Sequence, residues 1–248
     1  MKNIKAIFKR EFKAYFDSPV AYVFLVAFLV LIGFMTFGVA MFYERRQADL
    51  TPFFFWHPWV YLLLVPAATM GLWADERRNG TAELLLTLPM TAWNALVGKF
   101  LAAWTFIALA LALTFPVAVT VGYLGSPDWG AIVCGYLGSL LLAGAATAIG
   151  LFASSLSRSS VVGFVVSLAM VFFLLIVDVI NAFQAYAQIR LMTQGGPGKF
   201  TTTLVYLIYR ETFENMRYAS GATMSVILFV IMFILTAIQM RVEKKATY

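Results

Sequence analysis

The sequence has little charge and almost none of the residues that bind metals or form disulfides. Only 12% of its 248 residues are charged, against about 25% in a typical globular domain, and it has one cysteine and one histidine. The single cysteine, Cys134, excludes an internal disulfide and a cysteine metal cluster. His57 has no second histidine with which to share a metal. We therefore expect no metal site and no cofactor.

The shortage of charge goes with an excess of apolar residues, which make up 62% of the chain. A helix needs about 20 apolar residues to cross a bilayer core of about 30 Å, and the sequence contains six such segments. They indicate a single all-α, multi-pass domain, which we place in the inner (plasma) membrane. The expected spans are 21–42, 53–73, 100–123, 131–154, 161–181 and 222–240.

The distribution of lysine and arginine predicts the orientation. With six spans both termini lie on one side, and the segments on that side carry 12 of the 18 basic residues, against 6 on the other. Basic residues concentrate in the cytoplasm, so we expect cytoplasmic termini, a cytoplasmic loop over 74–99 and an outward-facing loop over 183–221. The basic residues are scattered and form no recognition motif, so the net charge of +6 does not indicate a nucleic-acid partner.

The first 18 residues have the pattern of an amphipathic helix. Apolar side chains recur at helical spacing, with basic residues on the other side, which is typical of a helix lying on a lipid surface. An alternative is a basic flank that only sets orientation. The residues that we expect to be buried are Ile4, Phe8, Phe12 and Tyr15.

Small residues recur every four positions in the fourth span, at Ala146, Gly150 and Ser154. Such a stripe lets helix backbones approach closely in lipid, so we expect it to face protein. The sequence leaves open whether that protein is the same chain or a second copy.

The sequence has no loop that could grip a nucleotide phosphate. Such a loop needs a glycine five residues before Gly-Lys and a Ser or Thr directly after it. Around Gly198 and Lys199 these positions hold Thr193 and Phe200. Nucleophile-plus-base sets are also missing. We therefore expect a protein that is not an enzyme and that would depend on another subunit for ATP hydrolysis.

The loop between the second and third spans carries the most distinctive motif. It reads Glu-Arg-Arg-x-Gly-Thr-x-Glu-Leu-Leu-Leu-Thr-Leu-Pro over residues 76–89 and is followed by Gly98-Lys99-Phe100. Together with the preceding chain, over residues 1 to about 170, it resembles the ABC-2 type permeases, in the branch of the gliding-motility and copper-maturation permeases.

The resemblance implies the membrane subunit of an ATP-binding-cassette transporter, with export the expected direction. It implies a separate ABC ATPase subunit and a second permease copy or paralogue as partners. A short helix from Thr81 would present leucines to the ATPase, while charged neighbours set its register. The alternative is a solvated turn. The residues that we assign to this contact are Glu76, Arg77, Arg78, Gly80, Thr81, Glu83, Leu84, Leu85, Leu88 and Pro89.

The last third of the chain has a different resemblance. Residues 181–188, 192–198, 201–209, 218–220 and 242–245 look like the end of binding-protein-dependent sugar and glycerol-phosphate importer permeases. The cytoplasmic Glu-Ala-Ala loop of that family is missing. The sequence therefore has the pattern of a chimera, natural or constructed, and an importer permease is the alternative function. A membrane scaffold that transports nothing is a third hypothesis.

One ionisable residue lies inside an expected span. Asp178 is in the fifth span, and a carboxylate at membrane depth is a candidate for a transport pathway. Because it is only a few residues from the expected outer boundary, it could instead reach headgroup water.

Overall fold

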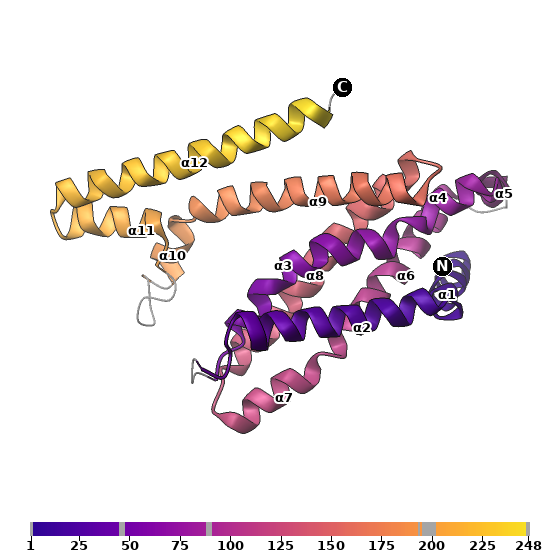
Figure 1. Cartoon of the computed structure of the whole chain (residues 1–248), viewed down its shortest axis with the longest axis horizontal. Helices are drawn as coiled ribbons and strands as arrows, with labels where there is room; N and C mark the ends of the chain where they lie inside the picture. Colours follow the sequence, from indigo (N-terminus) through magenta and orange to yellow (C-terminus); the bar gives the residue numbers. More distant parts are fainter. Residues whose placement is uncertain (1, 45–47, 88–90, 193, 195–201, 247–248) are drawn as a thin grey trace. The chain divides into compact units, whose positions relative to one another are not determined.

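In the computed structural model the described residues form helices and no strand (Figure 1). The structure describes the chain except residues 1, 45–47, 88–90, 193, 195–201 and 247–248, and the side chains of residues 2, 20, 84–86 and 242–246 are also not described. The chain divides into two compact units, Met1–Val171 and Phe172–Tyr248.

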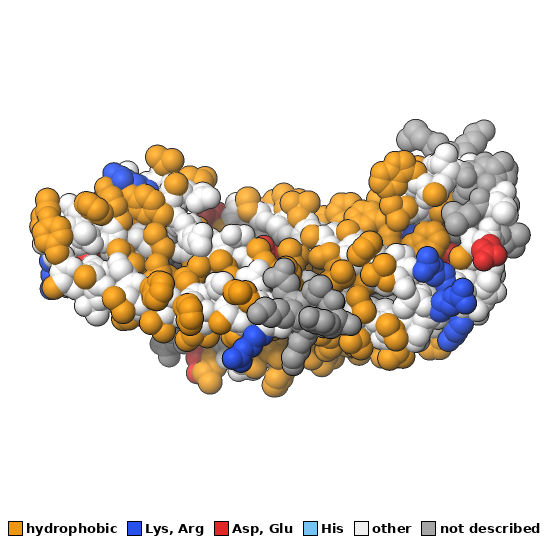
Figure 2. Space-filling model, turned by 90° about the horizontal axis from the view of Figure 1, so that it is seen from above, with side chains coloured by type: hydrophobic (Ala, Val, Ile, Leu, Met, Phe, Trp, Pro, Cys, Tyr) orange, Lys and Arg blue, Asp and Glu red, His pale blue; other side chains and the backbone are white. Residues whose placement is uncertain are grey.

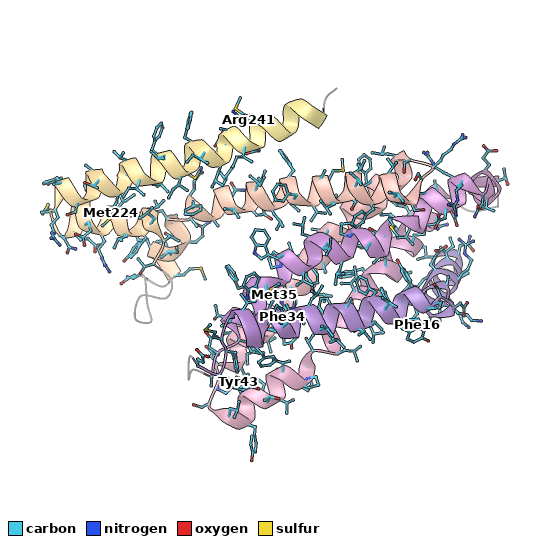
Figure 3. The ribbon with its side chains drawn as sticks, in the orientation of Figure 1. Phe16, Phe34, Met35, Tyr43, Met224 and Arg241 are labelled. Atoms are coloured by element: carbon cyan, nitrogen blue, oxygen red, sulfur yellow. The ribbon has the colours of Figure 1, made fainter. Side chains whose placement is uncertain are left out.

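The first unit contains the N-terminal helix and the first four spans. The chain bends at Ser18 between the first two helices and has a π-helical segment where the second ends. Figure 3 shows Phe34 and Met35 in that segment. The elements are α1 (Lys2–Asp17), α2 (Pro19–Gly33), η1 (Phe34–Val39), α3 (Thr51–Thr69), α4 (Gly71–Arg78), α5 (Thr81–Thr87), α6 (Ala92–Ala112), α7 (Phe115–Leu124), α8 (Trp129–Leu156) and the start of α9 (Ser160–Phe183).

Six helical stretches are long and apolar enough to cross a membrane, which confirms the all-α, six-span class. Each overlaps one of the six expected spans, and apolar side chains dominate the surface seen in Figure 2, as lipid contact requires. The stretches are Ala21–Val39, Thr51–Arg78, Ala92–Leu124, Trp129–Leu156, Ser160–Phe183 and Tyr218–Arg241.

The second span is interrupted at Met70, between α3 and α4. Pro66, which has no N–H, precedes this point by about one turn. The hydroxyl of Ser154 on α8 donates to the Met70 carbonyl at 2.8 Å and accepts from the amides of Trp73 and Ala74 at 3.0 and 3.2 Å. Ser154 thus satisfies backbone groups at the interruption and fixes where α4 begins.

The small-residue stripe of α8 faces protein within the same chain. Ala146 and Ser154 are buried. A Cβ on Gly150 would lie 2.1 Å from Thr69 Oγ1 of α3 and 3.2 Å from Ser167 Oγ of α9. The helices can approach this closely only because residue 150 has no side chain.

Helix α1 packs on the first half of α6. Ile7 is buried against Gly98, where an added Cβ would lie 2.7 Å from Ile7 Cγ2. The Tyr15 ring stacks on Phe106 with centroids 4.6 Å apart, and its hydroxyl donates to Ala68 O at 2.8 Å. Phe16, labelled in Figure 3, also contacts Phe106, at 5.9 Å. The apolar face of α1 therefore packs against protein, in addition to any contact that it makes with lipid.

The second unit contains the end of α9 and the last span. Its short helices precede the long α12, on which Figure 3 labels Met224 and Arg241. A Cβ on Gly221 of α12 would lie 2.0 Å from Thr212 Oγ1, so these elements also approach closely. The elements are α10 (Ala187–Met192), α11 (Leu204–Tyr209), η2 (Arg210–Glu214) and α12 (Tyr218–Ala246).

The close approach at Gly150 predicts a strong response to one methyl group. We expect Gly150→Ala to destabilise the protein by about 1–3 kcal/mol, because Thr69 must move or the helices must separate. Gly138→Ala, on the same helix with nothing within 4 Å of its Cβ position, is the control and should be neutral or slightly stabilising. Thermal unfolding of the two purified variants tests this, and equal melting temperatures would contradict it.

Candidate functional site

The candidate site begins where the second span leaves the expected membrane region. α4 ends at Arg78, and the chain turns through Gly80, whose φ of +71° is a left-handed conformation that favours glycine. The Thr81 hydroxyl donates to the Glu76 carbonyl at 3.3 Å across this turn. The turn lets α5 begin within three residues of the end of α4.

The residues assigned from the motif occupy both helices. Arg77, Arg78, Thr81 and Glu83 are exposed, whereas Glu76 is half-buried. Leu84 and Leu85 lie on α5, but their side chains are outside the described set. Leu88 and Pro89 lie outside the described residues. The structure thus places an exposed charged segment directly before the leucine-rich helix.

The most unusual side chain near this segment is Lys99 of α6, which is 1% exposed. Its Nζ donates to Leu72 O at 2.8 Å and to Glu11 Oε1 at 3.1 Å. It also forms an ion pair with Glu76 Oε1 at 3.0 Å. It also lies 5.1 Å from the centre of the Trp73 ring. The buried charge is therefore fully compensated.

Arg10 completes a neutral set of four charges with Glu11, Glu76 and Lys99. Its guanidinium donates to Glu76 Oε1 at 2.9 Å and to Glu11 Oε1. Burial alone would lower the pKa of Arg10, but the hydrogen bond to Glu11 and the charges of Glu11 and Glu76 outweigh it and raise the pKa. We call these four residues the ion cluster.

The ion cluster joins three segments that are distant in the sequence. Arg10 and Glu11 come from α1, Glu76 from α4 and Lys99 from α6. Because α5 lies between α4 and α6 along the chain, the cluster joins the two helices that flank α5.

Sequence reasoning identified Glu76 but missed its three partners. The pattern places Arg10 on the polar side of the N-terminal helix and Lys99 in the Gly98-Lys99-Phe100 motif, but it predicts a partner for neither, and it gives Glu11 no role. The available signal is the spacing of Glu11, four residues after Ile7 and four before Tyr15, which puts a carboxylate on the apolar face of α1. A charge on such a face predicts a buried partner.

The candidate for a transport pathway, Asp178, is not part of the ion cluster. It is exposed on α9, in the second unit. Within the described residues no group of three or more His, Cys, Asp or Glu side chains could hold a metal ion.

The buried charge of Lys99 predicts a large effect of its removal. Lys99→Met leaves Glu11 and Glu76 without their ammonium partner, and breaking a buried pair costs about 3–5 kcal/mol. Lys9→Gln, an exposed change on α1, is the control and should alter stability by less than about 0.5 kcal/mol. Thermal unfolding in detergent measures both, and a Lys99→Met protein that melts like Lys9→Gln would contradict the cluster.

Comparison with known proteins yields partial relatives. The chain is 48% identical over 79 residues to the sn-glycerol-3-phosphate transport system permease protein UgpA of Agrobacterium fabrum, and 46% and 47% identical over the same length to those of Escherichia coli and Pectobacterium atrosepticum. Each match covers 31% of this chain and 27% of the relative. These relatives support the resemblance to glycerol-phosphate importer permeases.

A family comparison covers much more of the chain. The family model described as ABC-2 family transporter protein matches residues 57–242, which include α4, α5, Lys99 and the boundary between the two units. The match extends over more than half of the sequence. The chain therefore belongs to the ABC-2 family of transporter proteins.

Proposed function

We propose that this protein is the permease subunit of an ATP-binding-cassette transporter in the inner membrane and that it exports its substrate. ATP is hydrolysed by a separate ABC ATPase subunit, and two permease subunits, either copies or paralogues, form the transport path. The family match and the six apolar helices support this proposal. The observation that carries it is the position of α5 between two helices tied by the ion cluster.

The proposed ATPase contact is the segment from Glu76 to Pro89. Its exposed residues Arg77, Arg78 and Glu83 would set register through charge complementarity, and the leucines of α5 would occupy a groove in the partner. In this proposal the termini and α5 lie on the cytoplasmic side, where ATP is available.

In this proposal the ion cluster transmits movement at the ATPase contact to the membrane helices. When the ATPase moves α5, α4 moves with it, and Glu76 and Lys99 carry the displacement to α1 and α6. The Ser154 bonds hold the other end of α4 at the interruption near Met70. In this proposal α4 transmits movement from the ATPase to α3, and Ser154 of α8 holds the end of α4 that adjoins α3.

The decisive experiment is co-purification with the cognate ATPase. We expect the double variant Leu84→Asp, Leu85→Asp to weaken association at least about tenfold, or ~1.4 kcal/mol, because carboxylates replace apolar contacts. The control makes the same kind of change on α10, at Leu191 and Met192, which are 83% and 82% exposed and lie in the expected outward loop. Unchanged association of the Leu84 and Leu85 variant would contradict the assignment of the ATPase contact to α5.

ATP turnover separates the permease from a membrane scaffold. A permease that couples to its ATPase changes the ATPase turnover, whereas a scaffold need not. We propose the permease because the helices on either side of α5 are joined by the ion pair of the buried Lys99, and a passive attachment has no need of such a link.

An importer permease is the second candidate, favoured by the glycerol-phosphate permease relatives. Under this alternative the loop 183–221 would receive sugar or glycerol phosphate from a binding protein. Uptake of labelled sn-glycerol-3-phosphate by cells that express this chain with its ATPase is the test. Under the export proposal we expect no uptake dependent on a binding protein, and such uptake would replace export with import.

A further inference from the structure

The N-terminal helix lies across the start of the first span rather than in line with it. The chain bends at Ser18, and α1 runs across the end of α2 in Figure 1. Because α2 begins the candidate span Ala21–Val39, α1 lies at the level where that span would enter the bilayer. A helix in this position meets lipid headgroups on any side that the protein does not cover.

One row of side chains on α1 faces protein. Ile7, Glu11 and Tyr15 are four residues apart and therefore share one face of the helix. Each contacts α6, and Tyr15 also reaches α3. The side of α1 that protein covers is thus known, and the remaining sides can be assigned relative to it.

The opposite row consists of three lysines. Lys5, Lys9 and Lys13, which we call the lysine stripe, are all exposed. Lys9 is two residues from both Ile7 and Glu11, or about 200° around a helix of 3.6 residues per turn. Among the described residues the lysine stripe forms no ion pair. Like charges four residues apart repel one another, so the stripe favours an anionic partner.

Two phenylalanines lie between the protein-facing row and the lysine stripe. Phe8 and Phe12 are half-buried and stack with ring centroids 5.6 Å apart. Aromatic rings beside lysines are typical of a helix at a membrane interface, where the rings enter the acyl region and the ammonium groups reach the headgroups. An acidic protein surface would satisfy the lysines but not the partly exposed rings. This arrangement therefore favours lipid.

We propose that the lysine stripe binds the phosphate groups of anionic phospholipids, with Phe8 and Phe12 in the acyl region beside them. Each lysine near an anionic leaflet contributes about a fivefold gain in affinity, so the stripe prefers phosphatidylglycerol to the zwitterionic phosphatidylcholine. Placement in the cytoplasmic leaflet follows from the expected cytoplasmic termini. Binding requires neither the ATPase nor transport, so it can hold even where the proposed function fails.

Native mass spectrometry of the purified full chain tests the proposal. The protein is titrated with phosphatidylglycerol and with phosphatidylcholine of identical acyl chains, and we expect at least about tenfold tighter binding of phosphatidylglycerol. The triple variant Lys5→Gln, Lys9→Gln, Lys13→Gln changes only exposed positions and should reduce this preference to about twofold or less. Equal binding of the two lipids by the wild-type chain would overturn the proposal.

A matched pair of double variants separates the lysine stripe from the net charge of the chain. Lys9→Gln with Lys13→Gln, and Arg77→Gln with Arg158→Gln, each remove two positive charges from exposed positions on the expected cytoplasmic side. We expect the first pair to lower phosphatidylglycerol binding at least about fivefold and the second to lower it less than about twofold. Equal losses would show that net charge alone sets the preference and would overturn the site. Weaker ATPase association of the lysine variant with unchanged lipid binding would replace the lipid with a protein partner.

Thermal unfolding in detergent tests whether the preference is electrostatic. At about 0.1 M salt, phosphatidylglycerol should raise the melting temperature of the wild-type chain above its value in phosphatidylcholine, because a ligand that binds the folded state stabilises it. Salt at about 1 M shortens the screening length from about 10 Å to about 3 Å and should remove this difference, as should the triple glutamine variant. A difference that persists in the triple variant would place the anionic lipid elsewhere and overturn the site.

Discussion

The packing of the N-terminal helix and of the segment before α5 depends on the burial of one ammonium group. Lys99 lies near the start of a membrane helix with 1% of its surface exposed, where an unpaired charge would cost several kcal/mol. The carbonyl of Leu72 and the carboxylates of Glu11 and Glu76 remove that cost. Glu11 belongs to α1, Leu72 and Glu76 belong to α4, and Lys99 itself belongs to α6. One charge therefore holds α1, α4 and α6 together.

The position of Glu11 in the ion cluster explains the pattern of apolar residues along α1. Ile7 sits over Gly98, one residue before Lys99, and Tyr15 stacks on Phe106 two turns later. Apolar contacts lie on either side of Glu11, and the burial of Lys99 strengthens its charge interactions, whereas Arg10 closes the cluster at the surface with its side chain 52% exposed. Packing and electrostatics therefore support each other along one helix interface.

Much of the fold follows from the sequence, because in lipid every backbone polar group must be hydrogen-bonded within the protein, and a helix achieves this within one segment. Six long apolar stretches leave helices as the solution, and the stripe at Gly150 predicts close contact with protein. Sequence alone did not identify which helix fills that space, since Thr69 and Ser167 are distant in the chain. The ion cluster was missed for a related reason. Lysine near a span end is ordinary as a topology signal, and only the fold shows that Lys99 is enclosed.

The distance between the cluster residues along the chain has a consequence for biosynthesis. Glu11 and Lys99 are 88 positions apart, so α1 is made long before the ammonium group that fixes it. Until α6 is made, Glu11 lacks the ammonium of Lys99 and Ile7 lacks Gly98, although Arg10 can already pair with Glu76 and Tyr15 can already bond to Ala68. The contacts of α1 with α6 therefore form only after the chain has been made as far as α6. The helix α1 thus completes its contacts only after α6 has been made, while α7 and α8 are still to follow.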